Sequence, residues 1–258
     1  MSQPLVFITG ASSGLGQALA LRYYRAGWRL ALIARRTELV DAWVAQQGVQ
    51  AQRVRIWAAD VADNAALRDV GAACIAELGV PDVVIANAGI SVGMDTAEFD
   101  DLAVMRQIFE TNNVGLAATF HAFVAPMRER GSGTLVGVAS VAGIRGLPGH
   151  GAYCASKAGV IAYCESLRGD LRSAGVRVVT LVPGYIDTPL TQKNRYSMPF
   201  LMSADDFAAA AYRAITAQAS YRVIPWQMGW IAKLLRALPD AWFDRLFANR
   251  ARKARRPT

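Results

Sequence analysis

The stretch LVFIT, residues 5–9, is a short apolar run that leads into the turn GASSGLG, residues 10–16, and then into a segment with helical spacing. A strand, a turn and a helix in this order place free backbone N–H groups and the positive end of a helix dipole at the turn. Glycine also lets the backbone approach a ligand closely. The pyrophosphate of a dinucleotide fits such a turn, and an ordinary glycine-rich turn is the alternative. The predicted contacts are Gly10, Ser12, Ser13, Gly14, Leu15 and Gly16.

The rest of the chain alternates strand-like runs with helix-length segments. Further apolar runs lie at 29–34, 54–58, 83–86, 134–139 and 176–182, and helices are predicted near 14–26, 37–47, 63–78, 98–129 and 152–174. This alternation predicts an α/β fold, a Rossmann-like doubly wound parallel sheet with helices on both faces. We expect a single such domain over 1–224, with a mobile substrate lid at about 186–203, followed by an extension over 225–258.

The composition is that of a globular protein. Of the 258 residues, 53% are hydrophobic and 19% are charged, which excludes a disordered chain. Three cysteines without metal-type spacing and only two histidines argue against a disulfide framework or a metal site. The start of the chain shows no secretory signal, so we expect a cytoplasmic protein. The uncharged stretch 111–127 is too short and too polar for a membrane span and predicts a buried helix.

The second strand ends in LIARR, residues 32–36, which bears on the choice of cofactor. No carboxylate stands where an NAD-binding protein places one for the ribose hydroxyls. Arg35 offers a charge-assisted fork to the 2′-phosphate of NADP, and the plane of Arg36 can stack on adenine. A solvated pair of arginines at a helix start is the alternative. We expect NADP(H) as the cofactor.

Two further strand ends carry expected cofactor contacts. Asp60 and Val61 follow the third strand, where the carboxylate can accept a hydrogen bond from the adenine amino group or, alternatively, cap a helix. The fourth strand is followed by Asn87, Ala88 and Gly89. Their small side chains can lie against the cofactor, and the Asn87 amide can tie adjacent strands together, so a cofactor role and a structural role are compatible here.

A tyrosine and a lysine four residues apart are candidates for proton transfer. Tyr153 and Lys157 share a helix face, and the adjacent ammonium favours phenolate, which predicts a lowered tyrosine pKa and an acid or base at Tyr153. Ser140 ends the fifth strand and can hold the substrate oxygen at the same sheet edge. Taken alone, such a pair more often lies on a helix surface, and such a serine is usually a cap. Asn112 is a polar residue in an apolar helix and needs buried partners.

Several motifs together, in type and in order, resemble the short-chain dehydrogenase/reductase family over about residues 4–224. They are the turn 10–16, residues 87–89, Asn112, Ser140, Tyr153, Lys157 and the pair Pro183 and Gly184. The resemblance implies that Tyr153 transfers the proton and that Ser140 positions the substrate oxygen. It also implies that Lys157 binds the nicotinamide ribose and tunes Tyr153, and that Asn112 holds a relay water.

The resemblance extends to the segment after the sixth strand and to assembly. That segment looks like the one that covers nicotinamide in the family, which implies contacts from Pro183, Gly184, Ile186 and Thr188. A homodimer or homotetramer is implied as well, built from the helices that contain residues 111–127 and 152–173.

The C-terminal extension is the least family-like part. Eight of its lysines and arginines, against two aspartates, follow Met228 and contribute most of the formal charge of +8. Two amphipathic patterns bear tryptophans and precede the cationic stretch 250–256. Their apolar faces can pack onto the lid or a second subunit, or contact an anionic membrane peripherally through 226–258. Nucleic-acid binding is not expected, because no base-stacking or groove-reading motif accompanies the charge.

These observations lead to one preferred function and to rivals on the same fold. We expect an NADP(H)-dependent oxidoreductase that transfers a hydride between nicotinamide and a carbonyl or secondary alcohol. The rivals are a catalytically silent NADP-binding regulatory protein and a membrane-recruited protein. A complete proton-transfer set favours catalysis, because a protein that only binds does not need one. Tyr185, Met198 and Phe200 in the lid favour an apolar substrate, which the sequence does not identify.

Overall fold

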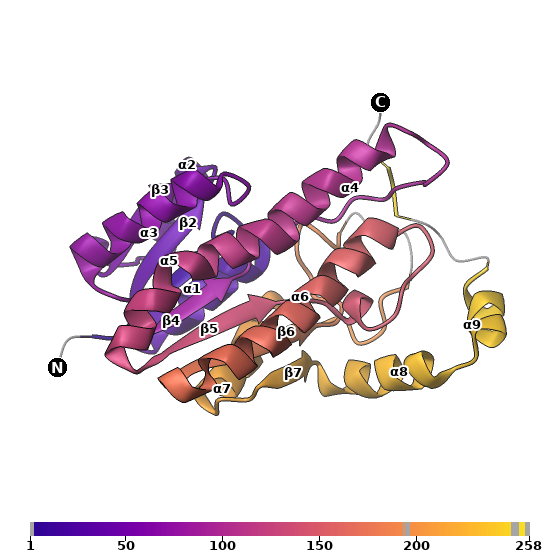
Figure 1. Ribbon diagram of the computed structural model, residues 1–258. Helices are drawn as coiled ribbons and strands as arrows, with labels where there is room; N and C mark the ends of the chain where they lie inside the picture. The colour runs from indigo at the N-terminus through magenta and orange to yellow at the C-terminus, as the bar shows by residue number, and fades with distance from the viewer. Residues whose placement is uncertain (1–2, 193, 195–196, 249–252, 256–258) are drawn as a thin grey trace.

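The computed structural model describes residues 3–192, 194, 197–248 and 253–255. Within these residues, seven strands form one parallel sheet in the order β3-β2-β1-β4-β5-β6-β7 (Figure 1). The strands are β1 (Leu5–Thr9), β2 (Arg29–Ala34), β3 (Val54–Ala58), β4 (Val83–Ala86), β5 (Gly133–Val138), β6 (Val176–Pro183) and β7 (Tyr221–Ile224). The predicted α/β fold, a doubly wound parallel sheet in a single domain, is confirmed.

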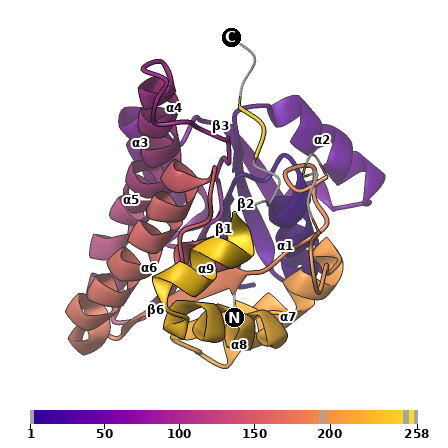
Figure 2. The same ribbon diagram turned by 90° about the vertical axis from the view of Figure 1, so that its right-hand side faces the viewer.

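Helices cover both faces of the sheet, as Figure 2 shows from the edge. On one face lie α1 (Gly14–Arg25), α2 (Thr37–Gln46) and α7 (Ala204–Thr216), and on the other lie α3 (Asn64–Leu78), α5 (Gly115–Arg130) and α6 (Gly151–Leu171). The pleat of β1 sends Val6 and Ile8 into one core and Leu5 and Phe7 into the other. Because both faces are buried, the strand is apolar at every position rather than at alternate ones.

The single helix predicted over 98–129 is divided in the structure. α4 (Asp101–Phe109) runs into a π-helical turn (Glu110–Val114), and α5 follows directly. The predicted helix therefore exists but begins later, and one widened turn interrupts its regular hydrogen bonding. Single π turns of this kind are frequent at functional sites. No described helix is long and apolar enough to cross a membrane.

The C-terminal extension packs on the body of the protein through its inner side. α8 (Trp226–Ala237) follows β7, and α9 (Asp240–Phe247) follows α8 after a short turn. Both helices bury apolar side chains, which are Met228, Ala232, Phe243 and Phe247. Of the predicted cationic stretch, Lys253 and Arg255 are described, whereas Arg250, Arg252 and Arg256 lie outside the described residues.

In its described residues, the lid predicted at 186–203 contains turns rather than a helix. Its two ends are joined by a bridge between Ile186 and Met202, and the Asp187 N–H donates to the Met202 carbonyl oxygen at 2.8 Å. Residues 193, 195 and 196 lie outside the described residues. The two ends of the segment are thus held together at the carboxyl end of β6.

Candidate active site

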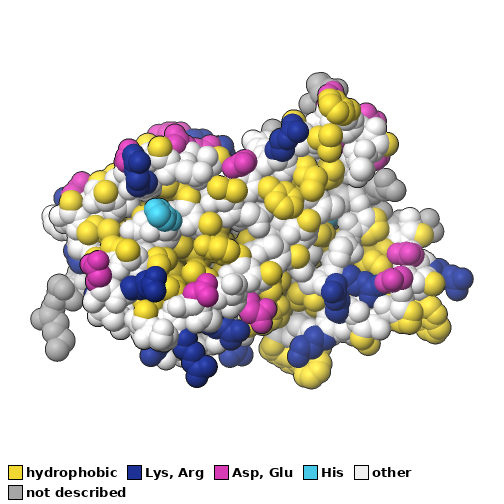
Figure 3. Space-filling model, viewed as in Figure 1, with side chains coloured by type: hydrophobic (Ala, Val, Ile, Leu, Met, Phe, Trp, Pro, Cys, Tyr) yellow, Lys and Arg dark blue, Asp and Glu magenta, His cyan; other side chains and the backbone are white. Residues whose placement is uncertain are grey.

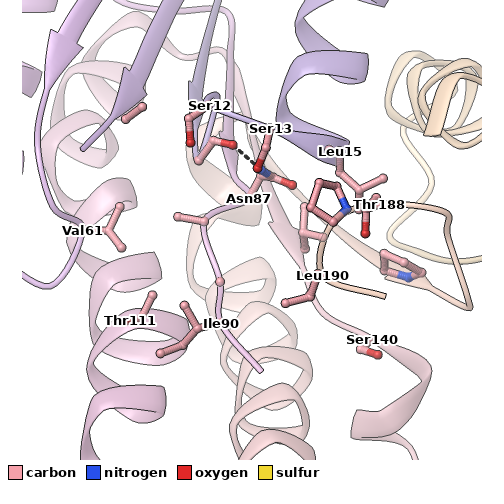
Figure 4. Close-up of a pocket in the computed structure, with 18 of the residues that line it drawn as sticks. Ser12, Ser13, Leu15, Val61, Asn87, Ile90, Thr111, Ser140, Thr188 and Leu190 are labelled. Atoms are coloured by element: carbon pink, nitrogen blue, oxygen red, sulfur yellow. Dashed lines mark hydrogen bonds between the residues drawn. The ribbon is translucent and has the colours of Figure 1, made fainter. Parts of the chain in front are cut away.

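The carboxyl ends of the parallel strands meet at one edge of the sheet and surround a cavity of about 400 Å³ (Figure 4). Its walls come from the turn after β1, the loops after β2 to β5, the start of α6 and the segment after β6. Every residue that the sequence predicted for cofactor contact or proton transfer lines this cavity, except Gly16 and Asn112. Residues as far apart in the sequence as Gly10 and Thr188 are thereby brought to one site.

Glycines let the turn after β1 pack closely against neighbouring backbone. Gly10 has a φ of 70°, and a Cβ atom added there would lie 2.8 Å from the Ala88 Cα atom. At Gly16 an added Cβ atom would collide with the Gly10 carbonyl oxygen. Ser13 at the start of α1 makes no side-chain cap, and the first turn has no acidic residue. The exposed N–H groups and the helix dipole fit an anion such as a dinucleotide pyrophosphate.

Asn87 ties the ends of β1 and β4 together. Its side-chain amide donates to the Thr9 carbonyl oxygen at 3.0 Å and to the Gly10 carbonyl oxygen at 3.3 Å. Its main-chain N–H donates to the Thr9 hydroxyl at 3.1 Å. The predicted structural role of Asn87 is therefore present, and these bonds hold the glycine turn beside the loop that begins at residue 87.

The end of the cavity beside β2 is basic. Arg35 and Arg36 are exposed at its rim, and Arg35 pairs with Asp60 at an N–O distance of 3.3 Å. The second oxygen of Asp60 accepts the Ala62 N–H at 3.0 Å. Both side chains of the ion pair are largely open to water, at 61% and 42%, so the pair is weak. Arg35 can therefore leave Asp60 for a stronger anionic partner.

Ser140, Tyr153 and Lys157 lie on another wall of the same cavity. The helix α6 begins at Gly151, so Tyr153 and Lys157 are one turn apart on one face, as predicted. The Lys157 ammonium lies 6.0 Å from the centroid of the Tyr153 ring and donates to the Val138 carbonyl oxygen at 2.8 Å. Ser140 follows β5 and interacts with Tyr153 through its side chain. The site thus places a phenol, a hydroxyl and a buried amine together.

The predicted lowering of the Tyr153 pKa by Lys157 is not what the structure gives. Burial raises the pKa of Tyr153 to about 12, and the hydrogen bond with Ser140 lowers it only in part. Burial also lowers the pKa of Lys157 to about 8. The interpretation from the sequence counted the neighbouring charge but not the loss of water around both groups, which disfavours each charged form.

Asn112 lies behind the cavity wall, in the π-helical turn. Its side-chain oxygen accepts the Ile90 N–H at 2.8 Å, and its amide group donates to the Ile90 carbonyl oxygen at 3.0 Å and to the Ser156 hydroxyl at 2.9 Å. These bonds join the loop after β4 to α6. The buried amide therefore has the partners that its position requires, and it positions Ile90, which lines the cavity.

The segment after β6 closes the site against the glycine turn. Thr188 is buried and lies so close to Gly14 that an added Cβ atom there would be 3.2 Å from the Thr188 Cβ atom. Figure 4 shows Thr188 and Leu190 facing the cavity on the side opposite Ile90 and Thr111. This arrangement joins the expected nicotinamide-covering segment to the expected pyrophosphate turn.

Sequence reasoning missed part of the cavity lining. The additional residues are Ile33, Ala34, Ala59, Ile90, Thr111, Val138, Ala139, Pro189, Leu190 and Thr191. Most of them directly precede or follow a predicted site residue, as Ile90 follows Gly89. That adjacency is the signal that could have identified them, because a loop that carries one contact brings its neighbours to the same cavity.

Comparison with known proteins identifies the family. A family model described as short chain dehydrogenase matches residues 4–198. The chain belongs to the short-chain dehydrogenase family. This short-chain dehydrogenase is accordingly an oxidoreductase. It is 40% identical to an uncharacterized oxidoreductase of Myxococcus xanthus, over 95% of its own chain and 96% of that protein. It is 37% identical to a sulfoacetaldehyde reductase of Chromohalobacter salexigens, over 96% and 94% of the two chains.

Solved structures agree with this assignment of the short-chain dehydrogenase. A short-chain dehydrogenase from Streptomyces avermitilis superposes with a TM-score of 0.78 at 25% identity, over 96% of this chain and 95% of that one. Another from Sphingobium yanoikuyae, solved in complex with NADPH, gives a TM-score of 0.77 at 25% identity, over 92% and 97%. The similarity thus extends over more than nine-tenths of this chain in both comparisons.

Proposed function

We propose that this protein is an NADP(H)-dependent oxidoreductase that transfers a hydride between nicotinamide and a carbonyl or secondary alcohol. The observation that carries the proposal is one cavity that combines the uncapped start of α1, the Arg35 guanidinium and the set of Ser140, Tyr153 and Lys157. The similarity to a relative solved with NADPH supports the class of cofactor.

In carbonyl reduction, Tyr153 donates its phenolic proton to the substrate oxygen while the Ser140 hydroxyl donates a hydrogen bond to the same oxygen. The hydride that the carbonyl carbon accepts would come from a nicotinamide held in the cavity. Because burial raises the pKa of Tyr153 to about 12, the phenol keeps its proton at neutral pH, as a general acid must. The Lys157 ammonium binds the ribose hydroxyls and stabilises the phenolate that remains after proton transfer.

Return of the proton to Tyr153 is assigned to a relay water at Asn112. Both amide hydrogens of Asn112 already have protein acceptors, Ile90 and Ser156. A relay water at this position is therefore a hydrogen-bond donor to an oxygen of Asn112 rather than an acceptor of its N–H. In alcohol oxidation the same groups carry the proton in the opposite direction.

The proposed preference for NADP(H) rests on the basic rim of the cavity. A 2′-phosphate can take both Arg35 and Arg36 as partners, and the exposed bond from Arg35 to Asp60 is weak enough to be exchanged for it. The Asp60 carboxylate is then free to accept a hydrogen bond from the adenine amino group. An NAD-binding protein would instead present the carboxylate directly after β2.

An apolar substrate is proposed from the apolar side chains of the cavity. Ile90, Ile186 and Leu190 line the same cavity as Tyr153. Phe200 and Leu201 of the lid are about half exposed. Alkyl and ring surfaces of a ketone or alcohol would be removed from water by these side chains, which contributes about 25 cal/mol per Å² of area buried.

We also propose assembly into a homodimer or homotetramer through α5 and α6. The outer sides of the π turn and α6 leave apolar side chains partly open to water, among them Val114 and Tyr163. A second copy of the same surface would cover them, because a twofold interface pairs identical patches.

The α8–α9 end supports a proposal of peripheral membrane contact. An outward-facing apolar stripe on α8 consists of Trp226, Trp230 and Leu234. A second stripe on α9 consists of Trp242 and Leu246. The exposed fraction of all five residues lies between 64% and 70%. Figure 3 shows Lys and Arg side chains among hydrophobic ones at this end of the molecule. Tryptophans flanked by cations are typical of helices that lie on anionic lipid.

The experiment that tests the proposed function is a screen of NADPH oxidation by the purified protein with apolar ketones, aldehydes and quinones, including fatty and steroid carbonyls. We expect turnover of at least one apolar carbonyl and loss of that turnover in Tyr153→Phe. Tight NADPH binding without turnover of any of them would instead favour a catalytically silent regulatory protein. Failure to bind NADPH would reject both functions.

A further inference from the structure

The last described residues return from α9 to the active site. The segment 253–255 lies between the loop that precedes α4 and the lid after β6, as its yellow trace shows in both ribbon views (Figures 1 and 2). These two neighbours begin as opposite walls of the cavity, since Ile90 belongs to the first and Leu190 to the second. The segment 253–255 therefore crosses from one wall to the other.

On the lid side, a lysine holds two groups of the lid. The Lys253 ammonium donates to the Asn194 side-chain oxygen at 2.7 Å and to the Leu190 carbonyl oxygen at 3.3 Å. The Leu190 side chain lines the cavity. A displacement of the lid away from the cavity would break both bonds, unless the chain end moved with it.

On the opposite side, backbone and side-chain contacts hold the same three residues. The Gly93 N–H donates to the Ala254 carbonyl oxygen at 3.0 Å. A Cβ atom added at Gly93 would collide with the Lys253 carbonyl group, so the two backbones pack directly. Glycine at this position permits that approach, which a larger side chain would prevent.

A buried carboxylate provides the strongest anchor. The Arg255 guanidinium donates to both oxygens of Asp101, at 2.8 and 3.3 Å, and lies 3.6 Å from Glu98. The side chain of Asp101 is only 10% exposed and also accepts the Asp95 N–H at 2.6 Å. These bonds hold the pKa of Asp101 below its usual value. Two-oxygen pairing of this kind is directional and resists rotation.

We propose that residues 253–255 form a strap that holds the cavity closed, and that Lys253 and Arg255 are positioning residues for the lid. Because the strap is bonded to both walls, either wall can move outward only after one set of contacts is released. The strap then controls access and release of the nicotinamide nucleotide and of the substrate, a statement that rests on the function proposed above. Opening of the cavity is thereby assigned to Lys253 and Arg255 rather than to the residues around Tyr153.

The test uses the full-length protein and the variants Arg255→Ala and Lys253→Ala, with Arg106→Ala as a matched loss of one exposed cation on α4. Hydrogen exchange at the Gly93 amide reports the strap without any cofactor. Release of bound NADPH, followed by its fluorescence in a stopped-flow mixing experiment, reports opening. For a carbonyl that is turned over, the separate values of kcat and KM report positioning. Asp101 is left unchanged because it also orders Asp95.

In both strap variants we expect faster hydrogen exchange at the Gly93 amide. NADPH release should be accelerated between about three- and tenfold, since affinity changes act mainly through release rates. The KM for the carbonyl should rise by a larger factor than kcat falls. Arg106→Ala should match the unmodified protein. Unchanged Gly93 exchange in Arg255→Ala would overturn the strap itself. Faster exchange with unchanged NADPH release and unchanged KM would overturn its control of the cavity. If the unmodified protein bound no NADPH, the proposed function would fail, while Gly93 exchange would still decide whether the strap exists.

Discussion

The Lys157 ammonium lies 6.0 Å from the centroid of the Tyr153 ring, in a site where burial favours the uncharged form of both groups. The phenol therefore holds its proton firmly, while the amine is close to losing its own near neutral pH. A protonated Tyr153 suits carbonyl reduction without further adjustment. Alcohol oxidation requires the phenolate, so binding of a cationic group near Tyr153 must lower the Tyr153 pKa before that direction can proceed.

Tyr153→Phe should reduce kcat for an identified carbonyl by about 10² to 10⁴, because the transferable proton is lost while the ring is kept. The dissociation constant for NADPH should stay unchanged. Tyr163→Phe, at an exposed position of the same helix, serves as the control. Steady-state kinetics and fluorescence titration measure the two quantities. Near-native turnover by Tyr153→Phe across the pH range would require another proton donor.

Lys157→Met should change how stability depends on pH. The folded pKa of Lys157 is near 8, below its ordinary 10.5, so the unfolded chain binds more protons between these values. The contribution of Lys157 is therefore fully present above pH 10.5 and is lost as pH falls through about 8. Urea unfolding at pH 7.5 and 10 should show the unmodified protein gaining stability relative to Lys157→Met at the higher pH. An equal difference at both values would contradict the burial of the amine.

Arg35→Ala should erode the preference for NADP(H) over NAD(H). A charge-assisted bond to phosphate contributes roughly 1.5 to 3 kcal/mol, which corresponds to about a tenfold to hundredfold loss of NADPH affinity. NADH affinity should change little, since NADH lacks the 2′-phosphate. Arg25→Ala, which removes an exposed arginine at the end of α1, is the control. Equal or tighter binding of NAD(H) by the unmodified protein would reject the predicted specificity.

Arg145→Met should loosen the C-terminal extension. The Arg145 guanidinium donates to the Leu235 and Leu238 carbonyl oxygens at the end of α8, pairs with Asp240 at 2.8 Å and lies 4.0 Å from the centroid of the Phe243 ring. Loss of these bonds should cost about 2 kcal/mol in the free energy of unfolding.

Because Arg145 lies in the loop after Ser140, Arg145→Met should also raise KM for substrate. Arg236→Met, which removes one longer and exposed bond to Ile144, should cost less. Unchanged kinetics and stability in both Arg145→Met and a chain truncated after Pro225 would show that the extension is an independent appendage.

The double change Trp226→Ser and Trp230→Ser should abolish flotation with vesicles that contain anionic phospholipid, while NADPH binding persists. Both indoles are about two-thirds exposed, so the folded core should tolerate the change. Binding of the unmodified protein should weaken as salt is raised, because surface charges are screened. If neither the unmodified protein nor the double variant floated with the vesicles, and these tryptophans were buried in a stable oligomer, the stripe would be an interface with a second copy of the chain.

Local sequence alone determined the architecture and most of the cavity. The run at residues 5–9, the glycine turn after it and the repeated alternation of strands and helices follow from side-chain periodicity and backbone preference, which act over neighbouring residues. The pair Tyr153 and Lys157 could be placed on one helix face for the same reason. Since parallel strands end at one edge, the convergence of their loops followed as well.

Tertiary structure decided everything that depends on contacts between distant residues. The sequence indicates that Asn112 needs buried partners, but only the folded chain identifies them as Ile90 and Ser156. The division of the long predicted helix beside them has no local signal. The ion pair of Arg255 with Asp101 joins residues 154 positions apart. The direction of the Tyr153 pKa was also beyond local reasoning, because desolvation depends on all the elements that enclose the phenol, and only the folded chain brings them together.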